Sequence, residues 1–173
     1  MSDTIEKENC PFCQTKTLEL NEEEREIPYF GKVYILSMNC DNCHFFKSDV
    51  ECVDNHGPVK IIFDVEYEDD LKVRLVKSAE AKVKLGPKMS MEPGTASIGF
   101  ITNVEGMINR FERIVEQQRD EAEDITVKKA AKNLLKKIRK VKAGEDSIKI
   151  IIEDPSGNSA IVSDKAVVTK SKK

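Results

Sequence analysis

Long hydrophobic runs are missing from this sequence of 173 residues. Its longest apolar runs, Val33–Leu36 and Ile148–Ile152, are far shorter than the roughly 20 apolar residues of a membrane-spanning helix. The start, Met1–Lys7, lacks the basic segment followed by an apolar one that marks a secretory signal peptide. We therefore expect no membrane partner, no export and a cytoplasmic location.

Histidine is scarce, and the common catalytic motifs are missing. Of the two histidines, His44 directly follows a cysteine pair and His56 precedes Gly57 and Pro58 in what reads as a connector. The sequence contains no glycine-rich Walker loop, no nucleophile elbow and no histidine-bearing metal motif. These absences argue against an enzyme. A thiol enzyme remains as one alternative, and it would require reactive thiolates.

Positive charge is scarce in the first third of the chain. Residues 1–56 hold 12 Asp and Glu against 5 Lys and Arg, a balance of −7, whereas the rest holds 19 against 23, a balance of +4. Binding to phosphate backbones depends on Lys and Arg, so the acidic part is poorly suited to nucleic acid. The length allows one ordinary domain or two small ones, with 39% hydrophobic and 34% charged residues.

What the sequence does contain is two Cys-x-x-Cys pairs. They read Cys10-Pro11-Phe12-Cys13 and Cys40-Asp41-Asn42-Cys43, with 26 residues between them. Each pair offers two thiolates from one tight turn, which is typical of a tetrahedral zinc site. Four thiolates leave no open position for water or substrate, so we expect one structural Zn²⁺ ion. The predicted ligands are Cys10, Cys13, Cys40 and Cys43.

Other uses of these cysteines fit less well. Disulfides would suit a secreted chain. A thioredoxin-like redox pair would need a βαβ unit, and none is indicated around either pair. The fifth cysteine, Cys52, has no partner nearby in the sequence and is most simply a small buried or surface residue.

The pattern around the cysteines predicts a zinc ribbon over residues 1–55. Strands are expected at Thr17–Leu20, Val33–Asn39 and His44–Val50. The charged segment Asn21–Glu26 interrupts the apolar pattern and is expected to form a solvated loop or a strand tip.

A mainly β domain is predicted over residues 56–173, after a boundary at Asn55–Pro58. An irregular or edge segment is expected at Met89–Gly99. The expected strands are Val59–Val65, Leu71–Lys77, Ala81–Leu85, Ile148–Ile152 and Ala160–Val162. Their β-branched residues and regular turn signals favour a barrel, sandwich or β-helix.

An antiparallel helical hairpin is predicted as an insertion at about residues 102–143. Thr102 and Glu105 have the spacing of a capping box, with Thr102 at the cap. The first helix carries an apolar stripe at Val104, Met107, Ile108, Phe111, Ile114 and Val115. The second starts near Thr126 and ends at Gly144. Its apolar stripe comprises Val127, Ala130, Ala131, Leu134, Leu135, Ile138 and Val141.

The second helix is strongly basic. It carries eight Lys and Arg, and no acidic residue falls between Val127 and Ala143. One interpretation is a docking surface for RNA or an acidic protein, and the other is a solvated face beside the acidic first helix. The possible basic surface comprises Lys128, Lys132, Lys136, Arg139 and Lys140.

Taken in order, these features resemble the ZPR-type zinc-finger protein family over about Cys10 to Val168. Besides the cysteine pairs, the resemblance rests on Ile27-Pro28-Tyr29-Phe30, Asp70-Leu71, Val76-Lys77-Ser78-Ala79, Thr102-x-Val104-Glu105-Gly106 and Asp154-Pro155-x-Gly157-Asn158-Ser159. It implies an α+β, mainly β fold, in which a four-cysteine zinc ribbon precedes a double-stranded β-helix-like domain with an inserted helical hairpin. The single set of motifs indicates the single-module, archaeal-type form.

The resemblance also implies a partner. Eukaryotic members of the family bind translation elongation factor one-alpha and assist its folding. We therefore expect a non-enzymatic, zinc-binding interaction module whose partner is translation elongation factor one-alpha. The alternative is an RNA- or ribosome-associated zinc ribbon that uses the basic helix.

Two segments are candidate partner-binding sites. Tyr29 and Phe30 either pack against the ribbon or present aromatic rings to a partner. The polar segment near residue 155 is either a binding loop on a β scaffold or turn chemistry between two strands, with Gly157 or Asn158 at positive φ. Its candidate residues are Asp154, Pro155, Gly157, Asn158 and Ser159.

Overall fold

The computed structural model describes residues 2–27, 31–52, 56–94 and 97–170. The strands among them are β1 (Ser2–Glu8), β2 (Leu18–Ile27), β3 (Gly31–Cys40), β4 (Phe46–Cys52), β5 (Val59–Val65), β6 (Arg74–Lys77), β7 (Lys82–Leu85), β8 (Met89–Met91), β9 (Phe100–Asn103), β10 (Ile148–Asp154), β11 (Ala160–Ile161) and β12 (Val167–Lys170). The helices are the 3₁₀ helix η1 (Glu68–Lys72), α1 (Val104–Glu121) and α2 (Ile125–Lys142). None of these helices is long and apolar enough to cross a bilayer.

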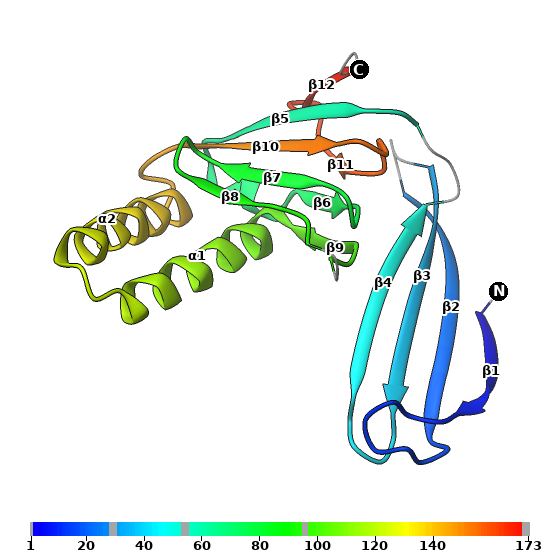
Figure 1. Cartoon of the computed structure of the whole chain (residues 1–173). Coiled ribbons are helices and arrows are strands. Elements are labelled where there is room, and N and C mark those ends of the chain that lie inside the picture. Colours follow the sequence, from blue (N-terminus) through cyan, green and yellow to red (C-terminus); the bar gives the residue numbers. More distant parts are fainter. Residues whose placement is uncertain (1, 28–30, 53–55, 95–96, 171–173) are drawn as a thin grey trace.

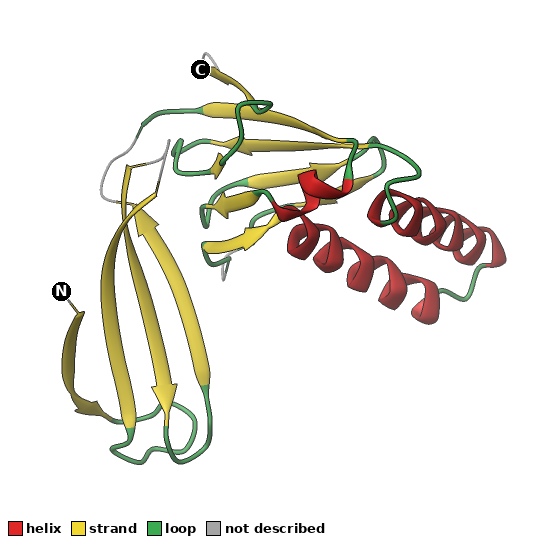
Figure 2. Cartoon of the chain, turned by 180° about the vertical axis from the view of Figure 1, so that it is seen from behind, coloured by secondary structure: helices red, strands yellow, loops and turns green. Residues whose placement is uncertain are grey.

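The described residues are arranged as an elongated ribbon, β1–β4, and a β domain, residues 56–170 (Figure 1). The view from behind shows that the ribbon and the helical hairpin α1–α2 extend from opposite ends of the β domain (Figure 2). The expected fold class, mainly β with an inserted helical hairpin, is confirmed. The expected domain boundary borders residues 53–55, which lie outside the described residues.

The ribbon is one antiparallel sheet in the order β1-β2-β3-β4. Strands β2 and β3 pair without interruption from Leu18 opposite Cys40 to Ile27 opposite Gly31. Of the two alternatives expected at Asn21–Glu26, the solvated loop is therefore wrong and the strand tip is confirmed. Backbone pairing with β1 and β3 holds this segment extended, while its charged side chains reach solvent and ion pairs form across the strands. One such pair joins Glu24 to Lys32 at 2.7 Å.

The β domain packs two antiparallel sheets face to face. Their strand orders are β12-β5-β10-β7-β8 and β11-β6-β9. Strand β5 coincides with the expected strand, and it pairs along its whole length with β10. Both sheets contribute to one apolar core, to which the hairpin adds its inner face. Its largest fully buried side chains include Phe63, Leu75, Leu85, Met107, Ile108, Phe111, Ile138, Ile150 and Ile152. This is the arrangement of a jelly roll, or double-stranded β-helix.

One further strand expectation needs correction, whereas the edge segment expected at Met89–Gly99 is confirmed. The segment expected as a strand at Leu71–Lys77 begins as the helix η1 and becomes extended only at β6. The cause is the carboxylate of Asp70, which accepts the backbone N–H groups of Glu66 and Tyr67 and tightens the chain into a turn. The segment expected at Met89–Gly99 provides an edge strand, β8, and its residues 95–96 lie outside the described residues.

The helical hairpin begins one residue later than the sequence suggested. Thr102 lies in β9 opposite Leu75, two residues before the first helical residue, Val104, so it is one position too early to be the cap. Asn103 is the cap instead, and its Oδ1 accepts the N–H of Gly106 at 2.7 Å. Helix α2 follows after a short link and ends at Lys142, and Gly144, just past the cap residue Ala143, has the left-handed φ of +68° expected after a helix C-terminus.

The apolar stripes of the two helices are buried to different extents. In α1 all six stripe residues are buried except Ile114, which is 40% exposed. In α2 the buried members are Ala131, Leu135, Ile138 and Val141. The remaining members, Val127, Ala130 and Leu134, are exposed or half-buried. The core therefore covers only part of the apolar face of α2.

Candidate metal centre

The four cysteines lie in two turns that share one backbone geometry at the far end of the ribbon. The carbonyl of Cys10 accepts the N–H of Gln14 at 2.8 Å, and the carbonyl of Cys40 accepts the N–H of His44 at 2.9 Å. Gln14 and His44 have φ values of 59° and 57°, the left-handed conformation that closes each turn. Because each turn reverses the chain over four residues, both thiols of a pair point to the same side.

Together the two turns bring the four sulfur atoms within 4.8 Å of one another. The Sγ atoms of Cys10 and Cys43 are 3.6 Å apart, and so are those of Cys13 and Cys40. Thiolates around tetrahedral zinc, with Zn–S bonds of about 2.3 Å, lie about 3.8 Å apart. The donor set and its spacing therefore fit one Zn²⁺ ion.

Polar groups next to the cysteines orient and polarise the sulfurs. The hydroxyl of Thr15 lies 3.0 Å from Cys13 Sγ, and that of Thr17 lies 3.2 Å from Cys40 Sγ. The N–H of Phe12 donates to Cys10 Sγ at 3.4 Å. The cysteine pattern alone does not assign Thr15 and Thr17 to the site. Their position just after Cys13 is the sequence feature that could identify them, because a hydroxyl group there can contact the sulfur atoms of the site.

The pKa values show why these thiols require a cation. Hydrogen bonds from the Thr15 side chain, Asn42 and the Thr15 backbone lower the pKa of Cys13 to about 5. The Thr17 hydroxyl likewise lowers the pKa of Cys40. At Cys43 a backbone hydrogen bond from Phe45 acts downward, but loss of solvent and the neighbouring cysteines outweigh it and raise the pKa to about 12. Four thiolates cannot share this space without a positive ion between them.

When bound, the zinc supplies the charge that lets all four thiolates coexist and joins the two turns. With four sulfur ligands the coordination shell is complete, so the site provides no open position for water or substrate. The centre is structural.

Comparison with known families agrees with this geometry. Family models of the ZPR1 zinc-finger domain and the ZPR1 jelly-roll domain match residues 5–55 and 69–172. The chain belongs to the ZPR1 family. The resemblance inferred from the motifs is thereby confirmed, and so is the structural zinc ion as cofactor.

Relatives in this family match most of the chain. A ZPR1-like protein of Methanocaldococcus jannaschii is 36% identical over 92% of this chain and 82% of its own length. A ZPR1-like protein of Pyrococcus horikoshii is 35% identical over 91% of this chain and 73% of its own length. The zinc finger chaperone zpr1 of Schizosaccharomyces pombe is 32% identical over 78% of this chain but only 30% of its own length.

Aromatic side chains lie around the ZPR1 metal turns; Phe12 and Phe46 are exposed, and Phe45 is half-buried against the cysteine cluster. Phe12, between the first two cysteines, is 77% exposed and stacks on Phe45 with ring centroids 5.0 Å apart. Phe46, the next residue, is 65% exposed. We call Phe12, Phe45 and Phe46 the aromatic tip. The sequence pattern marks Phe12 only as part of a zinc turn. The exposure of its ring in the structure identifies it as part of the aromatic tip.

The polar segment after β10 is largely internal. Asp154 is 2% exposed, and its carboxylate accepts the N–H and hydroxyl of Ser156 at 2.9 and 2.7 Å. It also accepts the hydroxyl of Ser159 at 2.6 Å. The Ser159 hydroxyl in turn accepts the N–H of Ser78 at 3.0 Å. Asp154 and Ser159 therefore shape the loop, as the turn interpretation requires.

The same loop packs against the connector between the ribbon and the β domain. Gly157 has a φ of +73°, and a Cβ there would collide with the carbonyl oxygen of Gly57. The N–H of His56 donates to the carbonyl of Ser156 at 3.1 Å. Pro155 is exposed and Asn158 half-buried, so these two are the loop's accessible candidates for partner contact. Tyr29 and Phe30 lie outside the described residues.

The structure places the basic candidates together on the outer face of α2. With 3.6 residues per turn they fall within about a third of the helix circumference. All are exposed, and none forms a salt bridge with a residue that the structure describes. These residues are Lys128, Lys132, Lys136, Arg139 and Lys140. Within the described chain, a salt bridge joins α2 to the acidic face of α1, between Lys142 and Glu112 at 3.0 Å.

Proposed function

We propose that this chain is a non-enzymatic, zinc-dependent protein-interaction module that binds translation elongation factor one-alpha as a chaperone-like factor. Membership of the ZPR1 family supports the proposal, and the Schizosaccharomyces pombe relative carries the name zinc finger chaperone. The closed four-thiolate centre is suited to holding a surface in shape rather than to reacting with a substrate. Such a role belongs in the cytoplasm, where translation takes place.

The observation that carries protein binding is the exposed aromatic tip. A stacked pair of phenylalanine rings on a rigid metal turn offers apolar area without the entropy loss of ordering a loop. Aromatic residues are enriched at protein interfaces and frequently provide most of the binding energy. The acidic balance of the ribbon favours a partner surface that is apolar and flanked by Lys or Arg.

Capture from a lysate tests the partner. Tagged, zinc-loaded protein is incubated with lysate of the source organism, and retained proteins are identified by mass spectrometry. We expect elongation factor one-alpha above the background of an untagged control. Recovery of no translation factor would overturn this partner.

The matched variants Phe12→Ser and Tyr67→Ser then test the surface. Both remove an exposed ring, but Tyr67, 68% exposed, lies on the β domain. With purified elongation factor one-alpha, we expect Phe12→Ser to weaken binding by about tenfold or more, the loss typical of an interface hot spot. Tyr67→Ser should bind as the original does. Zinc content must be equal in both, and equal affinities would exclude the aromatic tip.

Thiol labelling tests the non-enzymatic part of the proposal. The four cysteines of zinc-loaded protein should react slowly with a thiol reagent and quickly once a chelator has removed the metal. A cysteine of the site that reacts fast while zinc stays bound would instead support a thiol enzyme.

A second candidate function, RNA or ribosome binding, is favoured by the exposed basic face of α2. Its cations lack salt bridges to described residues and could neutralise phosphates. Such binding should weaken steeply with added salt and should drop when Lys132, Lys136 and Lys140 become Glu. Absent or salt-insensitive binding would exclude it.

A further inference from the structure

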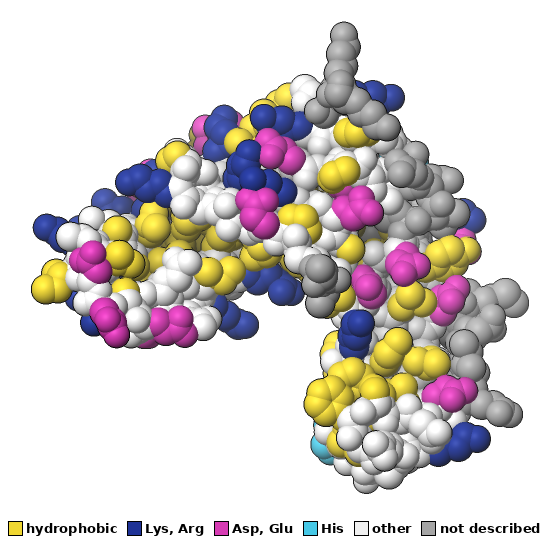
Figure 3. Space-filling view, in the orientation of Figure 1, with side chains coloured by type: hydrophobic (Ala, Val, Ile, Leu, Met, Phe, Trp, Pro, Cys, Tyr) yellow, Lys and Arg dark blue, Asp and Glu magenta, His cyan; other side chains and the backbone are white. Residues whose placement is uncertain are grey.

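The apolar face of α2 is wider than the surface that covers it. Ala131 and Leu135 are buried against the core, whereas Ala130 is exposed and Leu134 half-buried. Ala130, Leu134 and Lys137 follow one another at i, i+4 and i+7, so they form a single line along the helix. Figure 3 shows hydrophobic side chains gathered over the hairpin, with charged side chains of both signs along its margin.

A groove of about 350 Å³ lies along this line, between α2 and the turn that joins β7 to β8. The helix contributes Ala130 and Leu134, the turn contributes Pro87, and β8 contributes Met89. Ile148, at the start of β10, also lines the groove. Met89 and Ile148 are 7% and 5% exposed, so the groove reaches the edge of the apolar core.

Positive side chains stand on both sides of this apolar groove. Lys88 comes from the turn and Lys137 from the helix. Lys88 is exposed and forms no salt bridge within the described chain, while Lys137 contacts Asp146 only at 3.7 Å. Lys136 and Lys140, on the adjoining basic face, are likewise exposed. The combination of an apolar floor and cationic rims is complementary to a segment that is apolar on one side and acidic on the other.

We propose that this groove binds an acidic amphipathic helix of a partner protein. Leucine-like side chains of that helix enter between Met89 and Leu134, and its carboxylates meet Lys88 and Lys137. The inference stands apart from the proposed function, because it uses neither the aromatic tip nor a particular partner.

Other occupants fit less well. None of the described lining residues is aromatic, so the groove lacks the rings on which single-stranded bases stack. In a second copy of this chain the acidic helix α1 cannot fill the groove, because its apolar face is buried in its own core. The acidic segment Glu22–Glu26 lies within β2, where it pairs with β3 and, at Glu22 and Glu23, also with β1. That segment would have to leave its sheet before it could bind.

The test uses the full zinc-loaded chain and two fluorescent peptides. One peptide is an amphipathic helix of leucine and glutamate in heptads, and its twin has lysine in place of every glutamate. Fluorescence anisotropy should show binding of the glutamate peptide with a Kd of about 10–100 µM and negligible binding of the twin. Equal binding of both peptides, or of neither, would overturn the proposal.

Three variants locate the peptide. Lys88→Gln and Lys128→Gln remove one charge each, but Lys88 borders the groove and Lys128 lies on the outer face of α2. Ala130→Glu places a carboxylate in the groove at an exposed helical position, where it leaves folding intact. We expect Ala130→Glu to weaken binding about tenfold or more, Lys88→Gln about threefold and Lys128→Gln less than either.

A uridine oligonucleotide provides the competing outcome. If it displaces the glutamate peptide and all three variants lose affinity equally, the basic face binds polyanions and the groove proposal is overturned. If the variants lose affinity in the expected order and the oligonucleotide does not compete, the groove is the site.

Discussion

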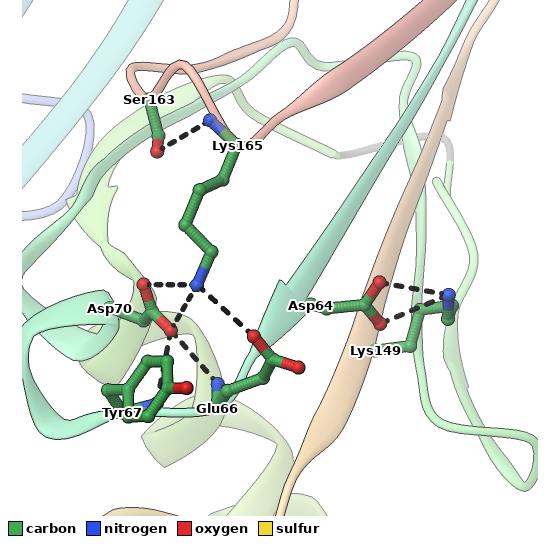
Figure 4. Close-up of polar contacts among 7 residues, drawn as sticks. All are labelled: Asp64, Glu66, Tyr67, Asp70, Lys149, Ser163 and Lys165. Carbon is green, nitrogen blue, oxygen red and sulfur yellow. Dashed lines mark hydrogen bonds and ion pairs between the residues drawn. The ribbon is translucent and has the colours of Figure 1, made fainter.

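At the scale of single residues, a buried carboxylate fastens the C-terminal part of the chain to the β domain. Asp70 is 6% exposed, and it accepts the N–H groups of Glu66 and Tyr67 as well as the ammonium of Lys165 at 2.8 Å (Figure 4). Burial acts to raise the pKa of Asp70, but the Lys165 ammonium and the two backbone N–H groups outweigh it, and the net pKa is lowered. The ionised form is therefore the one that the fold stabilises.

Replacing Asp70 by Asn should make stability less dependent on pH. A carboxylate whose pKa is depressed by folding contributes stability above the ordinary Asp pKa, and that contribution is lost as pH falls through the lowered value. We expect Asp70→Asn to lower the free energy of unfolding by about 1–3 kcal/mol at pH 7. The deficit should shrink below about pH 4. Urea unfolding of the original chain and the variant at pH 7 and below about pH 4 measures this difference in the free energy of unfolding.

The neighbouring residue provides the control for that measurement. Asp69 is exposed, with 90% of its side-chain surface accessible beside Lys72. Asp69→Asn should leave stability almost unchanged at both pH values. A pH-independent loss in Asp70→Asn would show that the carboxylate charge is not what matters.

The metal ligands supply the second prediction at this scale. Cys40→Ser removes one of four thiolates, so we expect zinc to be lost and the ribbon to unfold while much of the β domain remains folded. Atomic emission measures the zinc content, and two-dimensional NMR shows which part of the chain stays folded. Cys52→Ser is the matched control, because Cys52 pairs with Val33 in the ribbon sheet, seven positions along β3 from Cys40. Stoichiometric zinc and native thermal stability in Cys40→Ser would contradict the four-ligand site.

At the scale of elements, the start of helix α1 depends on where strand β9 ends. Thr102 has the side chain and spacing of a helix cap, yet its pairing with Leu75 keeps it extended. Asn103, opposite Arg74, is the last residue of β9, and its side chain accepts the N–H of Gly106. Helix α1 therefore begins where the sheet ends.

Removing the observed cap should weaken the hairpin more than removing the expected one. Asn103→Ala leaves the N–H of Gly106 without this acceptor and should lower the free energy of unfolding by about 1 kcal/mol. Thr102→Ala retains the cap and should have a smaller effect. Urea unfolding of both variants under the same conditions gives the comparison. The reverse order would restore Thr102 as the cap.

At the scale of the whole molecule, a small contact joins the ribbon to the β domain. Val33 of the ribbon is buried with Val76 and Ala160 of the β domain. Beside them, Asp49 Oδ1 accepts the N–H of Gly99 at 2.8 Å. The same oxygen accepts the N–H of Val50, also at 2.8 Å. One carboxylate thus links the last ribbon strand to the β domain.

Removing that carboxylate should loosen the ribbon without unfolding either unit. Asp49→Ala deletes the acceptor for Gly99, whereas Glu51→Ala removes an exposed acid from the same strand. We expect faster independent tumbling of the ribbon in Asp49→Ala, measured by ¹⁵N relaxation, and little change in Glu51→Ala. Unchanged relaxation in both would show that the apolar contact alone sets the ribbon's position.

The structural features that could be predicted from the sequence are those that depend only on residues close together in the chain. The two cysteine turns need only four residues each, and the helix stripes repeat at the helical period within one segment. Strand β5 and the end of α2 just before Gly144 follow from equally local signals. The acidic strand β2 and the edge strands β1 and β12 could not be found in this way, because distant backbone pairing holds them extended.

The sequence by itself determined the chemistry of the metal site and the type of most elements, because residue type and spacing act within a few positions. Tertiary structure alone decided which polar groups are buried, as at Asp154 and Asp70, since burial depends on segments far apart in the chain. It also decided how much of α2 the core covers. The uncovered groove beside Leu134 exists because the β7–β8 turn approaches that helix without filling the space.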